Sequence, residues 1–268
     1  MLFIVILNRS KGLAMRIKWI LLWVALAANS SVFAKDFQFC LENQQVPPFL
    51  LGTADIIEGK NGIVGDLLFI SSQTSNLPIK FNRRPWKRCI EELKHGKVDA
   101  VAAFVFSEDR DNWSAFPKTN GELDDRFFYQ SNYMVFTYPG SQISWDGESM
   151  LPKTAKVQSI PGYVADQMLQ DMGFIPSAPL QPKKALELVS RGLLDGFVME
   201  ALIGQTILND LGLADKVIAL ETPFSSQYWY AAFSKQAYEE RPEDIEAFWT
   251  ALKAARIEHS KALFDFYL

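Results

Sequence analysis

The residues of this chain best suited to hold a ligand are Arg110 and Glu200, because each follows an apolar, strand-like run. Arg110 comes three residues after Ser107, which follows the run 100–106, and Glu200 ends the run 196–200. A guanidinium is a planar fork suited to a carboxylate. In an open α/β sheet, ligands bind beyond the carboxyl ends of the strands. The two side chains therefore predict a cleft that grips a zwitterion, with Arg110 on its anion and Glu200 on its cation.

Both residues also have an ordinary structural explanation. Arg110 can be an exposed helix residue paired with Glu108 or Asp111, which contributes little to stability. Glu200 can be an acid at the start of the next helix, where the helix dipole favours a negative charge. The sequence alone leaves these alternatives open.

The stretch before Arg110 predicts a helix, a glycine stop and a buried strand. Pro85 suits a first helical turn because it has no N–H group to leave unpaired. Gly96 suits the left-handed residue that ends such a helix. Residues 100–106 carry no polar side chain, which is typical of a parallel strand covered on both faces. Ser107 then caps the helix that carries Arg110.

The same pattern returns roughly a hundred residues later. Gly192 and Asp195 match the spacing of Gly96 and Asp99, and each pair lies between an apolar helix and an apolar strand. Two similar α/β lobes with opposite charges at matching strand ends favour a ligand cleft. Such units also recur in unrelated folds, so the repeat alone does not establish a function.

Two linker-like stretches indicate where the chain crosses between these lobes. Residues 138–141 are the first of them, and the polar residues 222–226 around Pro223 suit the return crossing. The β-prone run 228–234 follows the return. Residues 118–125 are expected to form a polar loop.

The first 34 residues predict a secretion signal. Residues 15–18 are a basic region, residues 19–28 an apolar core, and residues 32–34 a small-residue cleavage site. The apolar core is too short for a spanning helix. We therefore expect Met15 to be the true start and cleavage near Ala34 to release the chain into the periplasm.

The charge balance of the chain excludes some classes of partner. The chain has 27 Lys and Arg against 31 Asp and Glu, and four of the cations but none of the acids precede residue 35. The remaining 234 residues therefore carry a net charge of −8. This balance argues against nucleic acid or an anionic membrane as a partner.

The cysteines and histidines indicate neither a metal site nor catalysis. Cys40 and Cys89 can form a disulfide in an exported protein, and the alternative is two buried thiols. His95 and His259 lie among charged residues at expected helix ends. No nucleophile elbow or metal-ligand spacing is present. We therefore expect no cofactor, no metal and no catalytic residue.

Taken together, the motifs resemble the extracellular solute-binding proteins of the amino-acid type, family three, with the type II periplasmic binding-protein fold. The resemblance covers about residues 37–253. Its motifs, in chain order, are Pro47-Pro48-Phe49, Gly62-x-x-Gly65-Asp66-Leu67, Trp86-x-Arg88 through Gly96 to Asp99, Ser107 to Arg110, Gly192-x-x-Asp195 with Glu200, and the Tyr-x-x-Phe-Ser-Lys ending at Lys235.

The resemblance implies an α/β fold of two lobes, joined by two crossing strands that act as a hinge. Residues 35–138 and 227–268 would form the first lobe, and residues 139–226 the second. A monomer would capture a small polar solute, an amino acid or related carboxylate, and deliver it to an inner-membrane ABC permease. The alternatives are a sensor that presents its ligand to a membrane receptor and a small-carboxylate dehydratase with Glu200 as general acid.

The resemblance also assigns roles within the cleft. A residue placed like Arg110 grips an α-carboxylate, one like Glu200 takes the ammonium, and one like Phe49 packs on the solute side chain. Backbone N–H groups after a turn like that at Gly162 assist the carboxylate.

Four more residues are candidates from their positions. Trp86, Phe104 and Tyr163 can stack on the solute, with core packing as the alternative, and Ser107 can bind it as well as cap a helix. Val105 stands where amino-acid binders usually carry a small or hydroxyl residue, and Tyr163 where they carry Ser or Thr. These departures leave the identity of the solute open.

Overall fold

The computed structural model describes residues 36–53, 59–175 and 178–268, so the predicted secretion signal lies outside the described residues. Residues 36–268 form one compact unit. In the described part of the chain, no helix combines the length and apolar character needed to span a membrane.

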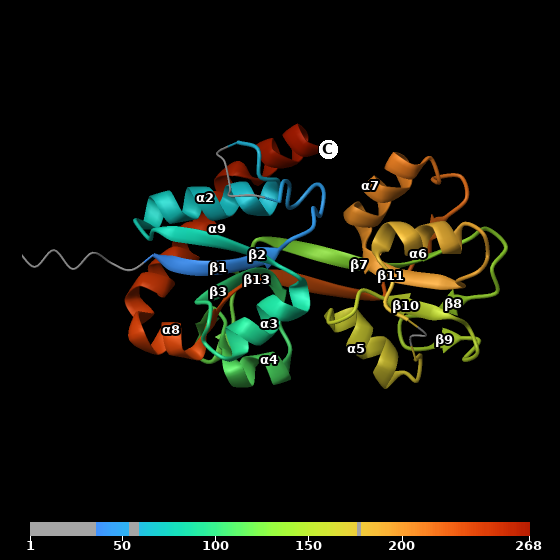
Figure 1. The fold of residues 1–268 in the computed structure, drawn as a ribbon, viewed down its shortest axis with the longest axis horizontal. Coiled ribbons are helices and arrows are strands. Elements are labelled where there is room, and N and C mark those ends of the chain that lie inside the picture. The colour runs from blue at the N-terminus through green and yellow to red at the C-terminus, as the bar shows by residue number, and fades with distance from the viewer. Residues whose placement is uncertain (1–35, 54–58, 176–177) are drawn as a thin grey trace, which may run out of the picture. The chain divides into compact units, whose positions relative to one another are not determined.

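A mixed β-sheet runs through this unit (Figure 1). Its main path has the order β10-β11-β7-β13-β3-β1-β2, with β12 beside β7 and β4 beside β13. The strands are β1 (Phe37–Glu42), β2 (Ile79–Arg84), β3 (Ala100–Val105), β4 (Ser114–Ala115), β7 (Tyr129–Thr137), β10 (Val157–Ser159), β11 (Gly196–Glu200), β12 (Ile218–Ala219) and β13 (Ser225–Ser234).

The sheet contains two parallel groups joined by two long antiparallel strands. β1 pairs in parallel with β2 and β3, and β10 pairs in parallel with β11. Between these groups, β7 and β13 pair with each other and extend from one group to the other (Figure 1). This arrangement gives two α/β lobes, with β7 and β13 as the crossing strands.

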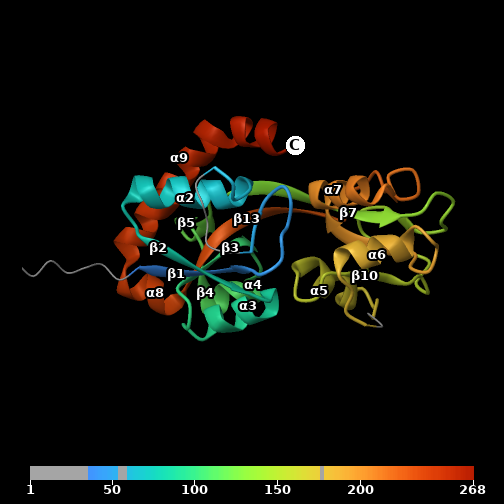
Figure 2. The same ribbon diagram turned by 45° about the horizontal axis from the view of Figure 1, so that its top comes forward.

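Helices cover the sheet on both faces. In Figures 1 and 2, α2 and α9 lie on one face of the first group and α3 and α4 on the other, while α6 and α7 lie opposite α5. The helices are α2 (Ile63–Ser75), α3 (Trp86–Lys94), α4 (Glu108–Trp113), α5 (Val164–Asp171), α6 (Pro182–Val189), α7 (Ala201–Leu211), α8 (Lys235–Glu240) and α9 (Pro242–Tyr267).

The largest hydrophobic core packs helices α2 and α9 on the first strand group and continues into the second lobe between β11 and helices α6 and α7. Phe39 is fully buried and packs against Phe233 and Phe248 with ring centroids 5.5 and 5.6 Å apart. A smaller core around Val157 and Val198 lies under α5. Burial of these side chains is the main force that holds each lobe together.

The sequence repeat corresponds to one local structure built twice. The Asp99 carboxylate accepts a hydrogen bond of 2.7 Å from the backbone N–H of Gln38, at the start of β1. The Asp195 carboxylate accepts the equivalent bond of 2.7 Å from Lys156, just before β10. Each aspartate thus fixes the start of the neighbouring parallel strand, and the preceding Gly96 and Gly192 have φ values of 64° and 66°.

The polar segment 118–125 is not the simple loop that its composition suggests. It contains a small hairpin of β5 (Lys118–Thr119) and β6 (Glu122–Leu123). Asp125, just after the hairpin, receives a 2.8 Å hydrogen bond from Lys253 of α9. The sequence predicted a polar loop here and gave no sign of the hairpin, because pairing between two-residue strands leaves little periodicity in the sequence. A second such hairpin joins β8 (Ser144–Trp145) and β9 (Met150–Leu151).

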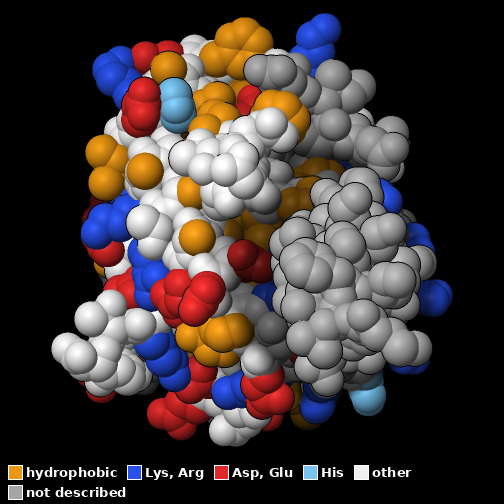
Figure 3. Space-filling model, turned by 90° about the vertical axis from the view of Figure 1, so that its left-hand side faces the viewer, with side chains coloured by type: hydrophobic (Ala, Val, Ile, Leu, Met, Phe, Trp, Pro, Cys, Tyr) orange, Lys and Arg blue, Asp and Glu red, His pale blue; other side chains and the backbone are white. Residues whose placement is uncertain are grey.

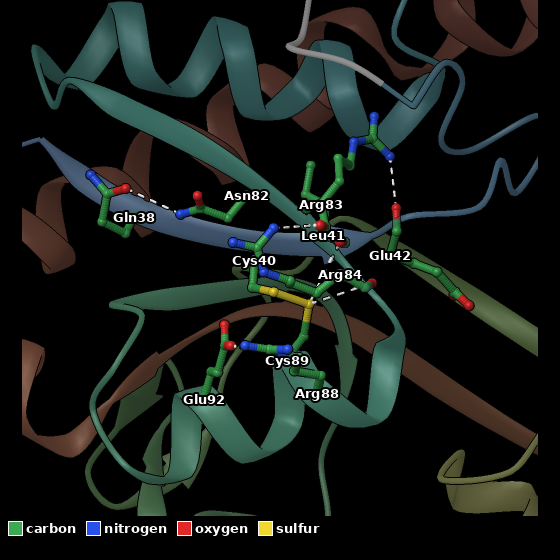
Figure 4. Close-up of a disulfide and its surroundings, with 10 residues drawn as sticks. All are labelled: Gln38, Cys40, Leu41, Glu42, Asn82, Arg83, Arg84, Arg88, Cys89 and Glu92. Carbon is green, nitrogen blue, oxygen red and sulfur yellow. Dashed lines mark hydrogen bonds and ion pairs between the residues drawn. A yellow bond between two sulfur atoms is a disulfide. The ribbon is translucent and has the colours of Figure 1, made fainter.

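The two cysteines form a disulfide in the structure. Cys40 in β1 and Cys89 in α3 have Cα atoms 5.4 Å apart, and both side chains are fully buried. Figure 4 shows the bond linking the strand to the first turns of the helix, with Glu42 on the same strand. The disulfide therefore ties together the elements that carry Glu42 and Trp86.

Charges of both signs are interspersed on the molecular face drawn in Figure 3. Lys, Arg, Asp and Glu side chains alternate there with scattered hydrophobic ones. On the part of this face that is not drawn in grey, the Lys and Arg side chains do not gather into one positive patch.

Candidate functional site

A small cavity of about 60 Å³ lies where the two lobes meet. Its walls come from strands β1, β3, β7 and β13, from helices α2, α3, α4, α5 and α7, and from the segment 46–50, and most of the lining side chains are apolar. The charged side chains among the lining residues are Arg110 and Glu42. A mostly apolar site with a few convergent polar groups is the usual character of a small-molecule site.

Arg110 reaches this cavity from the short helix α4, whose cap Ser107 accepts a 3.3 Å hydrogen bond from the Arg110 backbone N–H. Its guanidinium donates to the carbonyl oxygens of Val105 at 2.7 Å and Gly162 at 3.1 Å. It also lies 4.0 Å from the centroid of the Phe104 ring. Val105 belongs to one lobe and Gly162 to the other, so Arg110 bridges them.

The charge of Arg110 has no carboxylate partner among the described residues. The side chain is only 8% exposed, and burial lowers its pKa to about 10. The group therefore stays a cation at neutral pH. A buried cation without an ion-pair partner, on the wall of a cavity, is suited to an incoming anion.

Glu42 is a cavity acid that the sequence predictions missed. It ends β1, and one of its carboxylate oxygens accepts a 2.9 Å hydrogen bond from the Tyr163 hydroxyl of the opposite lobe. Burial raises the pKa of Glu42, and the hydrogen bond from Tyr163 opposes that shift. The rule that ligands lie beyond strand ends also points to this residue, because β1 neighbours β3.

Glu200 has a structural role at the start of α7. One of its carboxylate oxygens accepts a 2.9 Å hydrogen bond from the backbone N–H of Ile203, and the other is buried without a partner among the described residues. Burial raises the pKa of Glu200 to about 7, partly offset by the backbone N–H groups of the helix start. Glu200 is not among the residues that line the cavity. The structure therefore places Glu42, and not Glu200, on the cavity wall with Arg110.

The turn at Gly162 and Tyr163 forms the second lobe's side of the cavity. Gly162 has a φ of 88°, and its N–H donates to the Asp166 carboxylate at 3.2 Å while its carbonyl faces Arg110. The resemblance implied that N–H groups here assist a carboxylate. In this structure the Gly162 N–H already has a protein partner.

The predicted aromatic residues divide between the cavity and the core behind it. Phe49 and Trp86 line the cavity, and Phe49 packs against Trp229 with ring centroids 4.8 Å apart. Phe104 is fully buried beneath Arg110 and does not line the cavity. Tyr163 lines it and lies 6.1 Å, centroid to centroid, from Trp86.

The cavity wall also includes residues that were not predicted from the sequence, of which three stand out. Tyr133 of β7 and Trp229 of β13 line the cavity from the crossing strands. Ala103 lines it from β3, with a φ of 56° that is unusual for alanine. It lies at a register shift between β3 and β13, where a bulge redirects the strand. No sequence signal marks a bulge at this position.

The described residues contain no group of three or more His, Cys, Asp or Glu side chains that could hold a metal ion. The hydrogen-bonding side chains on the cavity wall include the Arg110 guanidinium, the Glu42 carboxylate and the hydroxyls of Tyr133 and Tyr163.

Several solved structures share this architecture. A histidine kinase sensor domain with similarity to periplasmic binding proteins has a TM-score of 0.68 at 18% identity, covering 87% of this chain and 96% of that one. An ancestral arginine-binding protein bound to glutamine has a TM-score of 0.66 at 16% identity, covering 88% of this chain and 99% of that one. The arginine-, lysine-, histidine-binding protein ArtJ from Geobacillus stearothermophilus has a TM-score of 0.65 at 14% identity, covering 87% of this chain and 95% of that one.

The sequence itself matches no protein-family model and no curated protein. The solved structures above are binding proteins and a sensor domain, and at identities below 20% their TM-scores show a shared fold and nothing further. The described chain therefore has the two-lobed α/β fold of the type II periplasmic binding proteins.

Proposed function

We propose that this protein captures a small solute that bears a carboxylate, and that Arg110 binds this carboxylate between the two lobes. The observation that carries the proposal is the buried Arg110 cation on the cavity wall, which has no carboxylate partner among the described residues. Glu42, as the cavity acid, would bind an ammonium group of the same solute. An amino acid or a related compound satisfies both groups.

The cellular setting of this proposal follows the predicted secretion signal. The mature chain would work as a monomer in the periplasm and deliver its solute to an inner-membrane ABC permease. The hinge prediction fits this role, because closure of two lobes over a solute changes the surface offered to a partner.

A sensor is the second candidate, and a specific observation favours it. The histidine kinase sensor domain aligns with 87% of this chain at a TM-score of 0.68. In that role the closed form would be presented to a membrane receptor. Recovery of either a permease or a receptor kinase from bacterial membranes with the solute-loaded protein would decide between the two.

The dehydratase alternative has less support. It needs an acid beside the bound solute, and Glu200, its candidate, is the cap of α7 and does not line the cavity. Incubation of the bound compound with the protein, followed by mass spectrometry, should recover it unchanged.

The test of the capture proposal is a thermal-shift series after removal of any bound compound by unfolding and refolding. The probes are the twenty standard amino acids and small mono- and dicarboxylates. A ligand at one hundred times its Kd stabilises by about 2.7 kcal/mol, which raises Tm by about 5–10 °C in a protein of this size.

Matched arginine variants make this test specific. Arg110→Ala should abolish every shift, and Arg110→Lys should weaken it because a lysine cannot bind a carboxylate through a planar fork. Arg88→Ala is the control, since Arg88 lies on the exposed side of α3 and pairs with Glu92. Unchanged shifts in Arg110→Ala would remove the proposal.

A further inference from the structure

The cavity beside Arg110 adjoins a much larger groove. The groove has a volume of about 830 Å³, against about 60 Å³ for the cavity. Glu42, Trp86 and Tyr163 line both spaces. A cavity of about 60 Å³ has room for only a few water molecules. In this arrangement the cavity can accept the end of a solute, and the rest of a longer solute would lie in the groove.

One chemical feature of the groove is its side-chain amides. Asn43, Gln44 and Gln45 line it from the segment after β1, and Gln181 lines it from the segment before α6. A carboxamide has both a donor and an acceptor. These side chains can therefore pair with the N–H and carbonyl groups of a ligand that carries several amides.

The second feature is a set of rigid apolar surfaces between those amides. Prolines contribute to the wall from both lobes, and they have no N–H group of their own to satisfy. Trp86 and Ile203 add larger apolar surfaces near the entrance to the cavity. The prolines in the groove are Pro47, Pro85, Pro161, Pro179 and Pro182.

We propose that the solute is a short peptide, which places its C-terminal carboxylate at Arg110 and its backbone along the groove. The proposal rests on the function proposed above, because the same cavity holds the carboxylate, and it extends that function to a class of substrate. A peptide combines one terminal anion with repeated amide groups, which is the combination that these walls match. A neutral saccharide would leave Arg110 without an anion.

The experiment is a competition in a defined mixture. Refolded, ligand-free protein is incubated with an equimolar pool of free amino acids, dipeptides, tripeptides and acidic monosaccharides. It is then desalted and denatured, and the released compounds are identified by mass spectrometry. Peptides should be enriched over free amino acids by about tenfold or more, which corresponds to roughly one extra well-made contact.

The outcomes separate this inference from the proposed function. Enrichment of free amino acids or of acidic sugars, without peptides, would overturn the peptide assignment and leave capture of a carboxylate in place. Retention of nothing, or equal retention by Arg110→Ala, would overturn the capture proposal and the peptide assignment with it.

A groove variant tests the amide contacts directly. Gln45 and Gln181 are exposed, so their replacement should leave the fold intact. Gln45→Ala/Gln181→Ala should weaken peptide binding by roughly two- to tenfold for each lost hydrogen bond, measured by calorimetry with a peptide from the pool. Gln236→Ala, on α8, is the matched control that should bind as the wild type does. Equal peptide affinity in the double variant would contradict the assignment.

Discussion

Arg110, which is buried, and Arg126, which is partly buried, differ in the groups that surround their charges. The side chain of Arg126 is 13% exposed and pairs with the carboxylates of Asp124, at 2.7 Å, and Glu246. Arg110 is as deeply placed but has backbone carbonyls and an aromatic ring around it. The protein supplies carboxylates for the charge of Arg126, whereas Arg110 has none among the described residues, as the capture proposal requires.

This contrast predicts opposite effects of two similar substitutions. Arg126→Ala should lower the free energy of unfolding by about 1–3 kcal/mol, because it removes the charge-assisted hydrogen bonds to Asp124 and Glu246, which keep only their bonds from Thr119 and Tyr238 and from a backbone N–H. Its ligand-induced thermal shift should persist. Arg110→Ala should lose that shift with a smaller change in stability. Urea unfolding measures the stability of both variants, and thermal shifts measure their ligand binding. If Arg126→Ala alone lost its ligand-induced rise in Tm, Arg126 and not Arg110 would be the ligand-binding arginine.

Glu200 predicts a dependence of stability on pH. Burial raises its pKa from 4.5 in the unfolded chain to about 7 in the fold. The folded state therefore holds the Glu200 proton more tightly than the unfolded chain does. The contribution of this proton to the free energy of unfolding is fully present at low pH and is lost as the pH rises from about 4.5 to about 7. Above that window the buried carboxylate costs about 3 kcal/mol, from the size of this shift.

The substitution that tests this is Glu200→Gln, whose amide oxygen can still cap α7. It should raise the free energy of unfolding by up to about 3 kcal/mol at pH 8 and change it little at pH 4. Glu239→Gln, at an exposed position on α8, is the control. Urea unfolding at the two pH values measures the difference in free energy of unfolding between Glu200→Gln and the wild type. An increase at pH 4 as large as that at pH 8 would contradict the raised pKa of Glu200.

At the scale of elements, the disulfide holds α3 against β1. It closes a loop with a sequence separation of 49 residues, and such a constraint typically stabilises by about 4 kcal/mol. The Cys40→Ala/Cys89→Ala variant should therefore unfold at a clearly lower urea concentration than the wild type. It should also bind solute more weakly, because Glu42 and Trp86 flank the bridge in sequence.

The control for this prediction is the wild type, unfolded and refolded with dithiothreitol. The reduced protein keeps both cysteine side chains, so it separates the effect of the bond from that of the missing sulfur atoms. If the reduced and oxidised proteins unfold at the same urea concentration, the bridge does not stabilise the fold.

The elements that sequence patterns predicted well are those fixed by local chemistry. The helix stop at Gly96 and the cap at Ser107 depend only on the backbone within a few residues. Asp99 bonds to the backbone of the adjacent strand. The types and spacing of these residues therefore predicted the helix end, the strand and the next helix start. The hairpin at 118–125 escaped prediction because its strands have two residues each. The bulge at Ala103 depends on register with β13, which no local pattern encodes.

At the scale of the whole molecule, the two-lobed architecture could be predicted because the order of helices and strands repeats. The identity of the cavity acid could not. Glu42 accepts its hydrogen bond from Tyr163, which is 121 residues away, whereas Glu200 caps its own helix at Ile203 and does not line the cavity. Opposite charges at strand ends predicted a cleft, but the side-chain directions that complete it come from tertiary packing.

The two lobes contact each other through the same groups that would hold a solute. Tyr163 donates to Glu42 at 2.9 Å, and Arg110 donates to the Gly162 carbonyl at 3.1 Å. Both bonds link residues on opposite sides of the crossing strands β7 and β13. A hydrogen bond that involves a charged group contributes about 1.5–3 kcal/mol. These contacts therefore favour the arrangement of the two lobes seen in the structure.

Tyr163→Phe should shift this balance toward an open form, because it removes the hydroxyl and keeps the ring beside Trp86. A loss of about 1.5–3 kcal/mol changes the ratio of closed to open molecules by roughly ten- to a hundredfold. Small-angle X-ray scattering without ligand should then give a larger radius of gyration than the wild type. Tyr238→Phe removes a hydroxyl bond of 2.8 Å to Glu246 within one lobe, so its scattering should match the wild type. Identical scattering from all three proteins would show that the bond between Tyr163 and Glu42 does not hold the lobes together.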